Sequence, residues 1–190
     1  MTIQSIVPGA VKILVAGGFG VGKTTMVGSV SEIAPLRTEE HLTRAGIEVD
    51  SLDGVRDKSA TTVALDFGRI TVRADLVLYL FGTPGQFRFW FMWDDLALGA
   101  LGAVVLVDTR RLEAGFAAVD FFEQRGIPFA VGVNCFHGRR DRTAEDVRRA
   151  LDLDPGVPVV LCDVRERNSS KELLLALLDR VHREALTEGR

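Results

Sequence analysis

The sequence contains few cysteines, no long hydrophobic run and no surplus of basic residues. Its two cysteines among 190 residues cannot form the disulfide framework of a small secreted domain, and they suit a reducing cytoplasm. No apolar run approaches the roughly 18 residues that suggest a membrane span, and neither end carries a lipidation motif. We therefore expect a cytoplasmic protein without a membrane anchor. The net charge of −3 argues against a nucleic-acid partner.

The composition is otherwise that of an ordinary globular chain, with 47% hydrophobic and 26% charged residues. We expect one domain over residues 1–190, with its core at about residues 10–186. Apolar runs alternate with helical patterns, which predicts an α/β fold with a mostly parallel sheet covered by helices on both faces. Six strands are expected, at Val11–Ala16, Val63–Val72, Leu76–Phe81, Ala103–Val107, Phe129–Val133 and Val157–Leu161. Of these, we expect only Val63–Val72 to be antiparallel, as one arm of a hairpin.

Helical patterns occupy most of the connections between these strands. Helices are expected at Lys23–Ala34, Leu112–Arg125 and Thr143–Leu151, and a last one is expected to open with a capping box at Ser169 and Glu172. Residues 36–60 are polar and have no strong period, so they are predicted to be a long loop. A loop of that length in a compact domain is usually functional.

A phosphate-binding loop follows the first expected strand. The segment from Gly17 to Thr24 matches G-x-x-x-x-G-K-[ST] and leads into an expected helix, which is the context that the motif requires. Glycines let backbone N–H groups surround phosphate oxygens, Lys23 reaches the β- and γ-phosphates, and Thr24 places its hydroxyl on Mg²⁺. The pattern predicts nucleoside triphosphate binding. The expected nucleotide contacts are Gly17, Gly18, Phe19, Gly20, Val21, Gly22, Lys23, Thr24 and Thr25.

A second motif ends the expected hairpin. The segment Gly82-Thr83-Pro84-Gly85-Gln86 resembles the D-T-A-G-Q segment of Ras-like GTPases. In those proteins the glycine senses the γ-phosphate and the glutamine orients the attacking water, which implies these roles for Gly85 and Gln86. Arg88, just beyond, is either an internal arginine finger or a solvated helix residue.

A third segment, Thr61–Phe67, resembles the end of switch I in the same proteins. The resemblance implies that Thr62 closes on Mg²⁺ and the γ-phosphate, with Thr61 as the next candidate. Together with Phe89–Asp95, Val107–Arg111 and Val133–Phe136, these motifs are similar to the small Ras-like GTPases of actinobacterial conserved operons (conservons), and more distantly to polarity GTPases of the MglA type.

This resemblance implies a Ras-like G domain with a six-stranded mixed sheet, and a GTP/GDP switch that uses Mg²⁺. It also implies two partners, a small Roadblock/LC7-type protein and a histidine-kinase-like signalling protein.

Three positions depart from the family pattern. Gly82 stands where Ras-like proteins place the aspartate associated with Mg²⁺, so the metal would depend on Thr24 and Thr62 or on another carboxylate. Asp108 is such a carboxylate if it does not merely cap a strand end. Phe19 occupies a loop position where glycine is favoured, and its ring would crowd the γ-phosphate and an incoming arginine finger. We therefore expect slow hydrolysis.

The base site matches least well. Ras-like proteins read guanine with N-K-x-D, whereas this chain has Asn134-Cys135-Phe136-His137. An imidazole cannot accept two parallel hydrogen bonds as a carboxylate does, so discrimination for guanine should weaken. In Cys162-Asp163-Val164, at the place of the S-A-K loop, the acid is either a substitute carboxylate or a turn residue. The expected base contacts are Asn134, Cys135, His137, Cys162, Asp163 and Val164, the cysteines being small packing residues.

The segment Phe87–Trp93 contains both tryptophans and three phenylalanines. Core packing explains one face of such a segment, and the other rings predict a hydrophobic partner surface that changes with nucleotide state. Three functions stay open from the sequence. They are a GTPase switch whose slow hydrolysis needs a partner, a nucleotide-binding interaction module with little or no hydrolysis, and an ATP-using P-loop protein with Asp108 as its Walker B acid.

Overall fold

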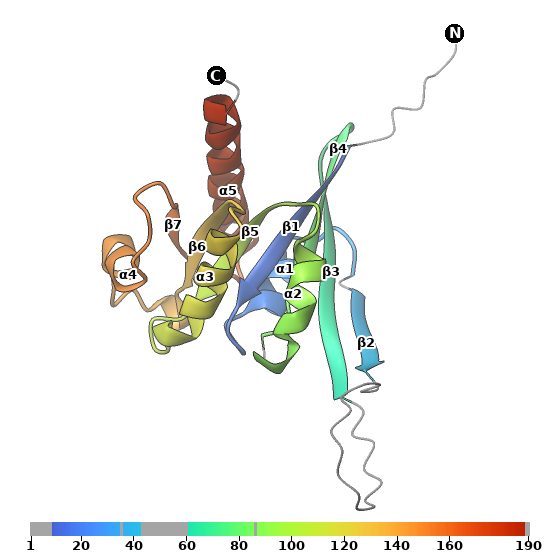
Figure 1. Ribbon diagram of the computed structural model, residues 1–190, viewed down its shortest axis with the longest axis horizontal. Helices are drawn as coiled ribbons and strands as arrows, with labels where there is room; N and C mark the ends of the chain where they lie inside the picture. Colours follow the sequence, from blue (N-terminus) through green and yellow to red (C-terminus); the bar gives the residue numbers. More distant parts are fainter. Residues whose placement is uncertain (1–8, 35, 43–60, 86, 189–190) are drawn as a thin grey trace, which may run out of the picture.

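A computed structural model describes residues 9–34, 36–42, 61–85 and 87–188 of the chain. A seven-stranded sheet in the order β2-β3-β4-β1-β5-β6-β7 forms its centre (Figure 1). The strands are β1 (Gly9–Gly17), β2 (Leu36–Leu42), β3 (Thr61–Arg73), β4 (Leu76–Gly82), β5 (Ala100–Val107), β6 (Phe129–Asn134) and β7 (Val159–Cys162). β3 pairs antiparallel with β2 and β4, and every other pairing is parallel. The sheet confirms the predicted α/β fold and the predicted hairpin.

The sheet has one strand more than the six that the sequence predicts. β2 lies within residues 36–60, which were expected to be loop, and it pairs with β3 from Leu36 opposite Phe67 to Leu42 opposite Thr61. Its sequence is mostly polar and lacks the apolar alternation that marks a half-buried strand. An edge strand needs only backbone pairing on one side, so its side chains give little signal. The other predicted loop residues, 43–60, lie outside the described part of the chain.

Helices connect the strands and cover both faces of the sheet. They are α1 (Lys23–Val30), η1 (Phe87–Met92), α2 (Trp93–Ala97), η2 (Leu112–Gly115), α3 (Phe116–Gln124), η3 (Phe136–Gly138), α4 (Ala144–Ala150) and α5 (Arg167–Glu188). The capping box expected at Ser169 and Glu172 is wrong, because α5 already begins at Arg167. The Ser169 hydroxyl instead accepts the Asp163 N–H at 3.0 Å.

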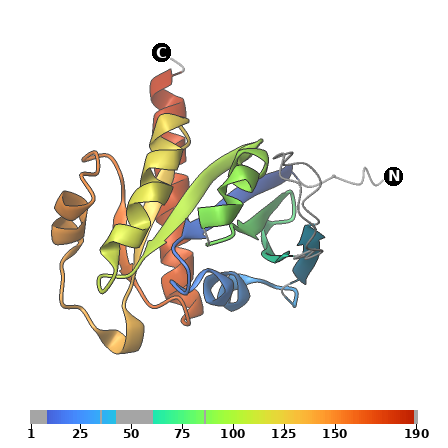
Figure 2. The same ribbon diagram turned by 60° about the horizontal axis from the view of Figure 1, so that its bottom comes forward.

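The hydrophobic core is divided by the sheet into two layers. Ile13 and Val15 of β1 pack with residues of α1 and α5, whereas Leu14 of the same strand packs with residues of α2, α3 and α4. Figures 1 and 2 show helices on both faces of the sheet. Because both faces are covered, β1, β5 and β6 consist of nearly uninterrupted apolar residues, as the sequence predicts for buried parallel strands. The carboxyl ends of the parallel strands meet at one edge, which Figure 2 brings forward. Ligands of open α/β sheets bind at such an edge.

Within the described residues, none of the helices has both the length and the apolar character needed to cross a membrane.

Candidate functional site

The predicted phosphate-binding loop connects β1 to α1 at the carboxyl edge of the sheet. Gly22 precedes α1 in a left-handed conformation, with φ of 110°. A Cβ at Gly22 would lie 2.8 Å from Asn134 Nδ2, so only glycine permits both the turn and this contact. Gly18 packs equally closely, since a Cβ there would come within 2.9 Å of the Ala114 Cβ. These contacts fix the loop against β6 and η2, and the N-terminus of α1 opens toward it.

Lys23 is held inside this loop by backbone carbonyls. Its Nζ donates to the Gly17 oxygen at 2.9 Å and the Gly18 oxygen at 2.8 Å. Burial lowers the pKa of the Lys23 ammonium to about 8, and the nearby Asp66 carboxylate partly opposes this shift. A phosphate would give the ammonium a charged partner that neutral carbonyls do not.

A buried acid, Asp66, reaches the loop from β3, which β4 separates from β1. The Thr24 hydroxyl donates to Asp66 Oδ2 at 2.5 Å. Asp66 lies on β3 directly opposite Gly82 of β4, and a Cβ at Gly82 would be 3.0 Å from the Asp66 Cβ. The carboxylate missing at position 82 is therefore supplied across the hairpin, and Gly82 leaves the room for it. We did not find Asp66 from the sequence, because identifying it requires the register between β3 and β4.

Thr24 and Asp66 suit a magnesium ion. Hydroxyl and carboxylate oxygens are the hard ligands that Mg²⁺ prefers, and the ion usually takes its other ligands from phosphates and water. No cluster of three or more His, Cys, Asp or Glu that would hold a metal occurs in the described part of the chain.

The other two predicted magnesium groups have different outcomes. Thr62 has its backbone in β3, four residues before Asp66, and its side chain lies outside the described part of the chain, so its role stays a prediction. Asp108 accepts the Arg110 N–H at 2.9 Å and the Arg110 Nη2 at 2.7 Å. The Arg110 guanidinium holds the pKa of Asp108 below its usual value, and the acid caps the turn after β5.

The segment after β4 brings Gly85 to the phosphate-binding loop. A Cβ at Gly85 would lie 2.5 Å from Lys23 Nζ and 3.1 Å from the Phe19 Cα. Gly85 thus lies beside the ammonium group of Lys23 and the Phe19 backbone. The catalytic candidate Gln86 lies outside the described residues, and Arg88 has its backbone in η1 with its side chain outside the description.

The aromatic segment Phe87–Trp93 is divided between core and surface. Trp93 is buried, and its Nε1 donates to the Pro84 carbonyl at 3.1 Å. The Trp93 ring also packs edge-on against Phe121, with centroids 5.1 Å apart. Phe91 by contrast is 64% exposed. The buried indole therefore holds the segment beside Gly85, while the Phe91 ring faces outward.

The base side of the site is organised by Asn134. Its Nδ2 donates to the Val21 carbonyl at 2.9 Å, and its Oδ1 accepts the Val164 N–H at 3.4 Å. The predicted contacts at Val21, Asn134 and Val164 are thus brought together. Cys135 and Cys162 are buried beside them, with both Sγ atoms 3.5 Å from the Val133 oxygen. Burial raises the pKa of the Cys162 thiol to about 12, so it remains neutral and packs as an apolar group.

The two polar candidates of the base site have different geometries. His137 is exposed and adopts a left-handed conformation with φ of 55°. Asp163 accepts Arg165 Nη2 at 2.6 Å and Arg165 Nε at 2.9 Å, and it also accepts the Arg165 N–H. The Arg165 guanidinium, and more weakly His137, lowers the pKa of Asp163 to about 2. Asp163 therefore has the contacts of a turn residue, and its carboxylate is already paired.

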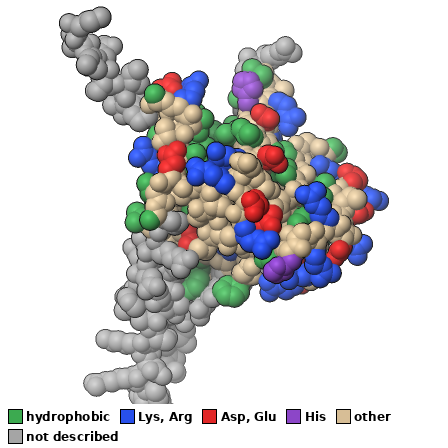
Figure 3. Space-filling view, turned by 180° about the vertical axis from the view of Figure 1, so that it is seen from behind, with side chains coloured by type: hydrophobic (Ala, Val, Ile, Leu, Met, Phe, Trp, Pro, Cys, Tyr) green, Lys and Arg blue, Asp and Glu red, His purple; other side chains and the backbone are tan. Residues whose placement is uncertain are grey.

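Basic side chains gather next to this end of the site. Figure 3 shows Lys and Arg side chains along the lower edge of the molecule, at the end that carries α4. The η3–α4 segment supplies Arg139, Arg140, Arg142, Arg148 and Arg149. Arg139 pairs with Asp141, and Arg149 with Asp146. Such pairs at exposed positions are typical of a solvated surface.

A protein-family model described as conserved hypothetical ATP binding protein matches residues 15–184, which include every motif above. The chain belongs to this family of conserved hypothetical ATP binding proteins. A relative from Methanocaldococcus jannaschii, the uncharacterized protein MJ1339, is 31% identical over 126 residues. That match covers 65% of this chain and 69% of the relative.

Solved structures similar to this family member are G domains of the iron transporter FeoB. The G domain of T. maritima FeoB has a TM-score of 0.63 at 16% identity, over 90% of this chain and 99% of that one. The G domain of Methanococcus jannaschii FeoB has a TM-score of 0.61 at 16% identity, over 91% and 98%. The longer cytosolic domain of T. maritima FeoB scores 0.65 at 15% identity, and the chain spans 64% of its length. These likenesses confirm a P-loop α/β fold of the G-domain type, whereas the conservon and MglA resemblance stays a prediction.

Proposed function

We propose that the protein binds GTP and GDP with Mg²⁺ and acts as a slow nucleotide-dependent switch. The observation that carries the proposal is one connected set of contacts. It runs from Asp66 through Thr24 and Lys23 to Gly85, the residue that joins the phosphate-binding loop to the aromatic segment. A ligand in the loop is therefore in a position to act on the segment that Trp93 fastens. The fold and the family membership support nucleotide binding, and the switch is our own inference.

The chain's own groups give each step a physical basis. Phosphate oxygens of a triphosphate would replace the two carbonyl oxygens that Lys23 contacts. The γ-phosphate would then lie next to the Gly85 backbone. Magnesium, held by Thr24 and Asp66, would neutralise phosphate charge. Gln86 is the residue that we propose to orient the attacking water. Phe19 is 69% exposed at the tip of the loop, where its ring restricts access, and this supports slow hydrolysis or none.

Guanine is our first choice of base, and adenine is the second. The Asn134 contacts to Val21 and Val164 support a guanine-type site. Against strict selectivity, position 137 is a histidine and the carboxylate of Asp163 is paired with Arg165. A site without a carboxylate reserved for guanine discriminates less, because fewer buried polar groups are left unpaired by the wrong base. We therefore expect a modest preference.

The first test measures binding and turnover of four nucleotides. We expect GTP and GDP to bind more tightly than ATP and ADP, by roughly tenfold rather than the 10⁴-fold or more of a site built to pair with its base. Calorimetric titration gives the affinities, and single-turnover phosphate release gives the rate. Tight binding with no release would favour the interaction module. A preference for ATP would overturn the guanine assignment, and absence of binding would overturn the proposal.

A second prediction concerns the tryptophan fluorescence. Because the Trp93 indole is bonded to the Pro84 carbonyl, one residue before Gly85, a γ-phosphate that moves Gly85 should change the environment of the indole. We expect the emission of the Trp90→Phe variant, which retains Trp93, to differ between GDP and a non-hydrolysable triphosphate. The Trp93→Phe variant is the comparison. Equal spectra in both nucleotides would show that this segment does not respond.

We also propose two partner proteins. The family resemblance favours a Roadblock/LC7-type protein and a histidine-kinase-like protein, and exposed rings such as Phe91 offer a surface that would suit one of them. Stronger binding of either purified partner to the triphosphate form than to the diphosphate form is the expected result. Binding that ignores the nucleotide would argue against a switch.

A further inference from the structure

Arg111 lies against the tip of the phosphate-binding loop. Its Nη2 donates to the Phe19 carbonyl at 3.2 Å, and a Cβ at Gly20 would be 3.7 Å from the same atom. A Cβ at Gly85 would lie 3.1 Å from the Phe19 Cα, so Phe19 also lies beside the proposed γ-phosphate end of the loop. The guanidinium therefore lies against the backbone of the loop at Phe19 and Gly20.

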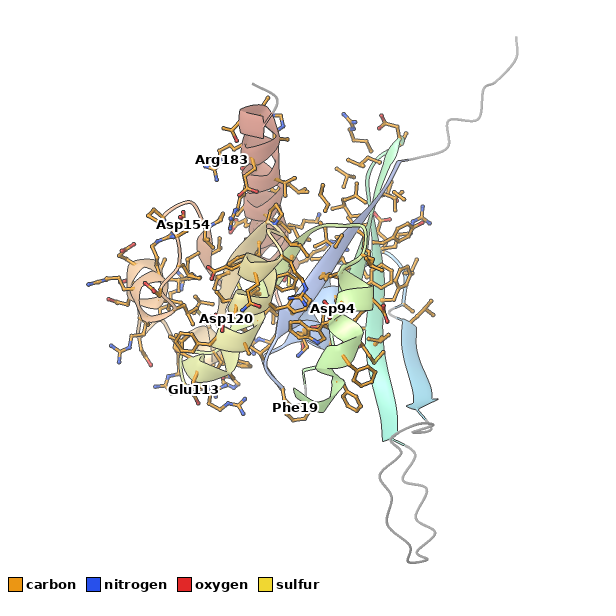
Figure 4. All side chains as sticks on the ribbon, in the orientation of Figure 1. Phe19, Asp94, Glu113, Asp120, Asp154 and Arg183 are labelled. Atoms are coloured by element: carbon orange, nitrogen blue, oxygen red, sulfur yellow. The ribbon has the colours of Figure 1, made fainter. Side chains whose placement is uncertain are left out.

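The backbone that carries Arg111 is fixed, whereas its side chain is exposed. The Arg111 N–H donates to the Asp108 carbonyl at 2.9 Å, and the Ala114 N–H donates to the Arg111 carbonyl at 3.1 Å. The next turn, η2, packs against Gly18, and the cavity left between η2 and the loop is only about 10 Å³. In Figure 4 Phe19 and the η2 residue Glu113 lie at the same lower end of the molecule. The arginine is thus positioned by a rigid support beside the loop.

The two neighbouring arginines differ in their partners. Arg110 makes a bidentate pair with Asp108 and stacks on Phe136, with 4.3 Å from its guanidinium carbon to the ring centroid. For Arg111, no acidic side chain of the described residues lies within ion-pair distance, and a neutral carbonyl holds it. A phosphate oxygen is a stronger partner for a guanidinium than a carbonyl oxygen is. Arg111 acts on the Asp108 carboxylate only through its charge at longer range, so its guanidinium N–H groups can still donate to an anion in the loop.

We propose that Arg111 contacts the outer phosphates of the bound triphosphate and serves as an internal arginine finger. This proposal rests on the nucleotide-binding function above. In the hydrolysis step, the oxygen of water bonds to the γ-phosphorus and the bond from that phosphorus to the β–γ bridging oxygen breaks. The proton released by the water ends on the phosphate product. Arg111 stabilises the negative charge that grows on the bridging and γ-phosphate oxygens.

The position of Phe19 favours an arginine from this chain over one from a partner protein. Its exposed ring stands at the loop position through which an arginine from a partner would enter, so external charge is sterically opposed. Arg111 approaches the same residue from η2 and bonds its backbone, which leaves the ring where it is. If Phe19 excludes a partner's arginine and Arg111 takes its place, hydrolysis would be slow. An arginine from a partner protein would not stimulate it.

The test compares Arg111→Ala and Arg111→Lys with the control Arg183→Ala. Arg183 lies on α5 at the opposite end of the molecule (Figure 4). For Arg111→Ala we expect single-turnover hydrolysis to fall by about 100-fold or more. We expect diphosphate affinity to stay within about twofold, and the complex of GDP with aluminium fluoride, which mimics the planar transition state, to be lost. Arg111→Lys should recover part of the rate, since a charge without the planar fork remains.

Four other results would overturn the proposal, and each has a different meaning. If Arg111→Ala hydrolyses within about twofold of the unmodified protein, Arg111 does not act on the phosphates. If diphosphate affinity and melting temperature fall together with the rate, Arg111 only supports the loop. If the unmodified protein binds triphosphate without turnover, there is no finger, although nucleotide binding stands. If no nucleotide binds, the proposed function fails as well.

Discussion

Replacing Asp66 with alanine is expected to lower the affinity for GTP about 10- to 100-fold in excess magnesium. In excess EDTA, which removes magnesium, the affinity of this variant for GTP should equal that of the unmodified protein. The reason is that Asp66 is the acid that reaches the Thr24 hydroxyl, so its loss removes the charged group that would hold the ion there. A charged interaction of this kind contributes about 1.5–3 kcal/mol. Calorimetric titration of GTP with and without magnesium measures the difference.

The opposition of Asp66 and Gly82 allows a sharper version of this experiment. The Gly82→Asp variant alone should bind GTP poorly, because its Cβ would lie 3.0 Å from that of Asp66 and would place two carboxylates in one space. In the double variant Asp66→Ala, Gly82→Asp, a single carboxylate would again lie beside Thr24, now supplied by β4 instead of β3. We expect this double variant to regain magnesium-dependent affinity to within about tenfold of the unmodified protein.

The control for both variants is Asp75→Asn, in the turn at the far end of the same hairpin. Asp75 pairs with the exposed Arg73, so its replacement should change neither affinity nor magnesium dependence. Failure of the double variant to recover affinity, when its melting temperature matches that of the unmodified protein, would show that Asp66 does not act as the magnesium acid.

Replacing Lys23 with methionine should abolish nucleotide binding without destabilising the fold. The affinity for GTP is expected to fall about 100-fold or more, because the ammonium is the buried cation within the loop. Burial lowers its pKa from 10.5 to about 8, which means that keeping the charge opposes folding at neutral pH by on the order of 3 kcal/mol. The melting temperature of the nucleotide-free variant at pH 7 should therefore be equal or higher.

Lys12 supplies the matched control on the same strand. Its Nζ donates to the Leu98 carbonyl at 3.1 Å, away from the loop, so Lys12→Met should keep normal nucleotide affinity. Calorimetric titration of both variants measures their nucleotide affinity, and thermal unfolding measures their stability. A marked fall in the melting temperature of Lys23→Met would mean that Lys23 stabilises the empty loop.

The sequence predicted the parts of the fold whose signal is local. Strands such as β1 and β5 are nearly continuous apolar runs because they are buried on both faces. The hairpin of β3 and β4 is marked by the short polar turn between them. β2 could not be predicted in the same way, because a polar edge strand is held by backbone bonds to β3 and its side chains carry no pattern.

The candidate site shows the same division. The phosphate-binding loop is a contiguous motif, so its residues could be named in advance. Asp66 could not, because it becomes part of the site only through its register opposite Gly82. The alternatives for Asp108 and Asp163 also depended on their neighbours, and each carboxylate is paired with an arginine two residues further along the chain.

The pairing of β2 with β3 has a consequence for how other proteins can approach this sheet. Seven residues of β2 already satisfy the outer backbone of β3, from Phe67 to Thr61, which is the strand that carries Asp66. A foreign strand that pairs with β3 on this side must first displace β2, which belongs to the same molecule and so has a far higher effective concentration than any separate partner. β2 therefore competes with any separate protein for backbone pairing with β3, the strand that carries Asp66.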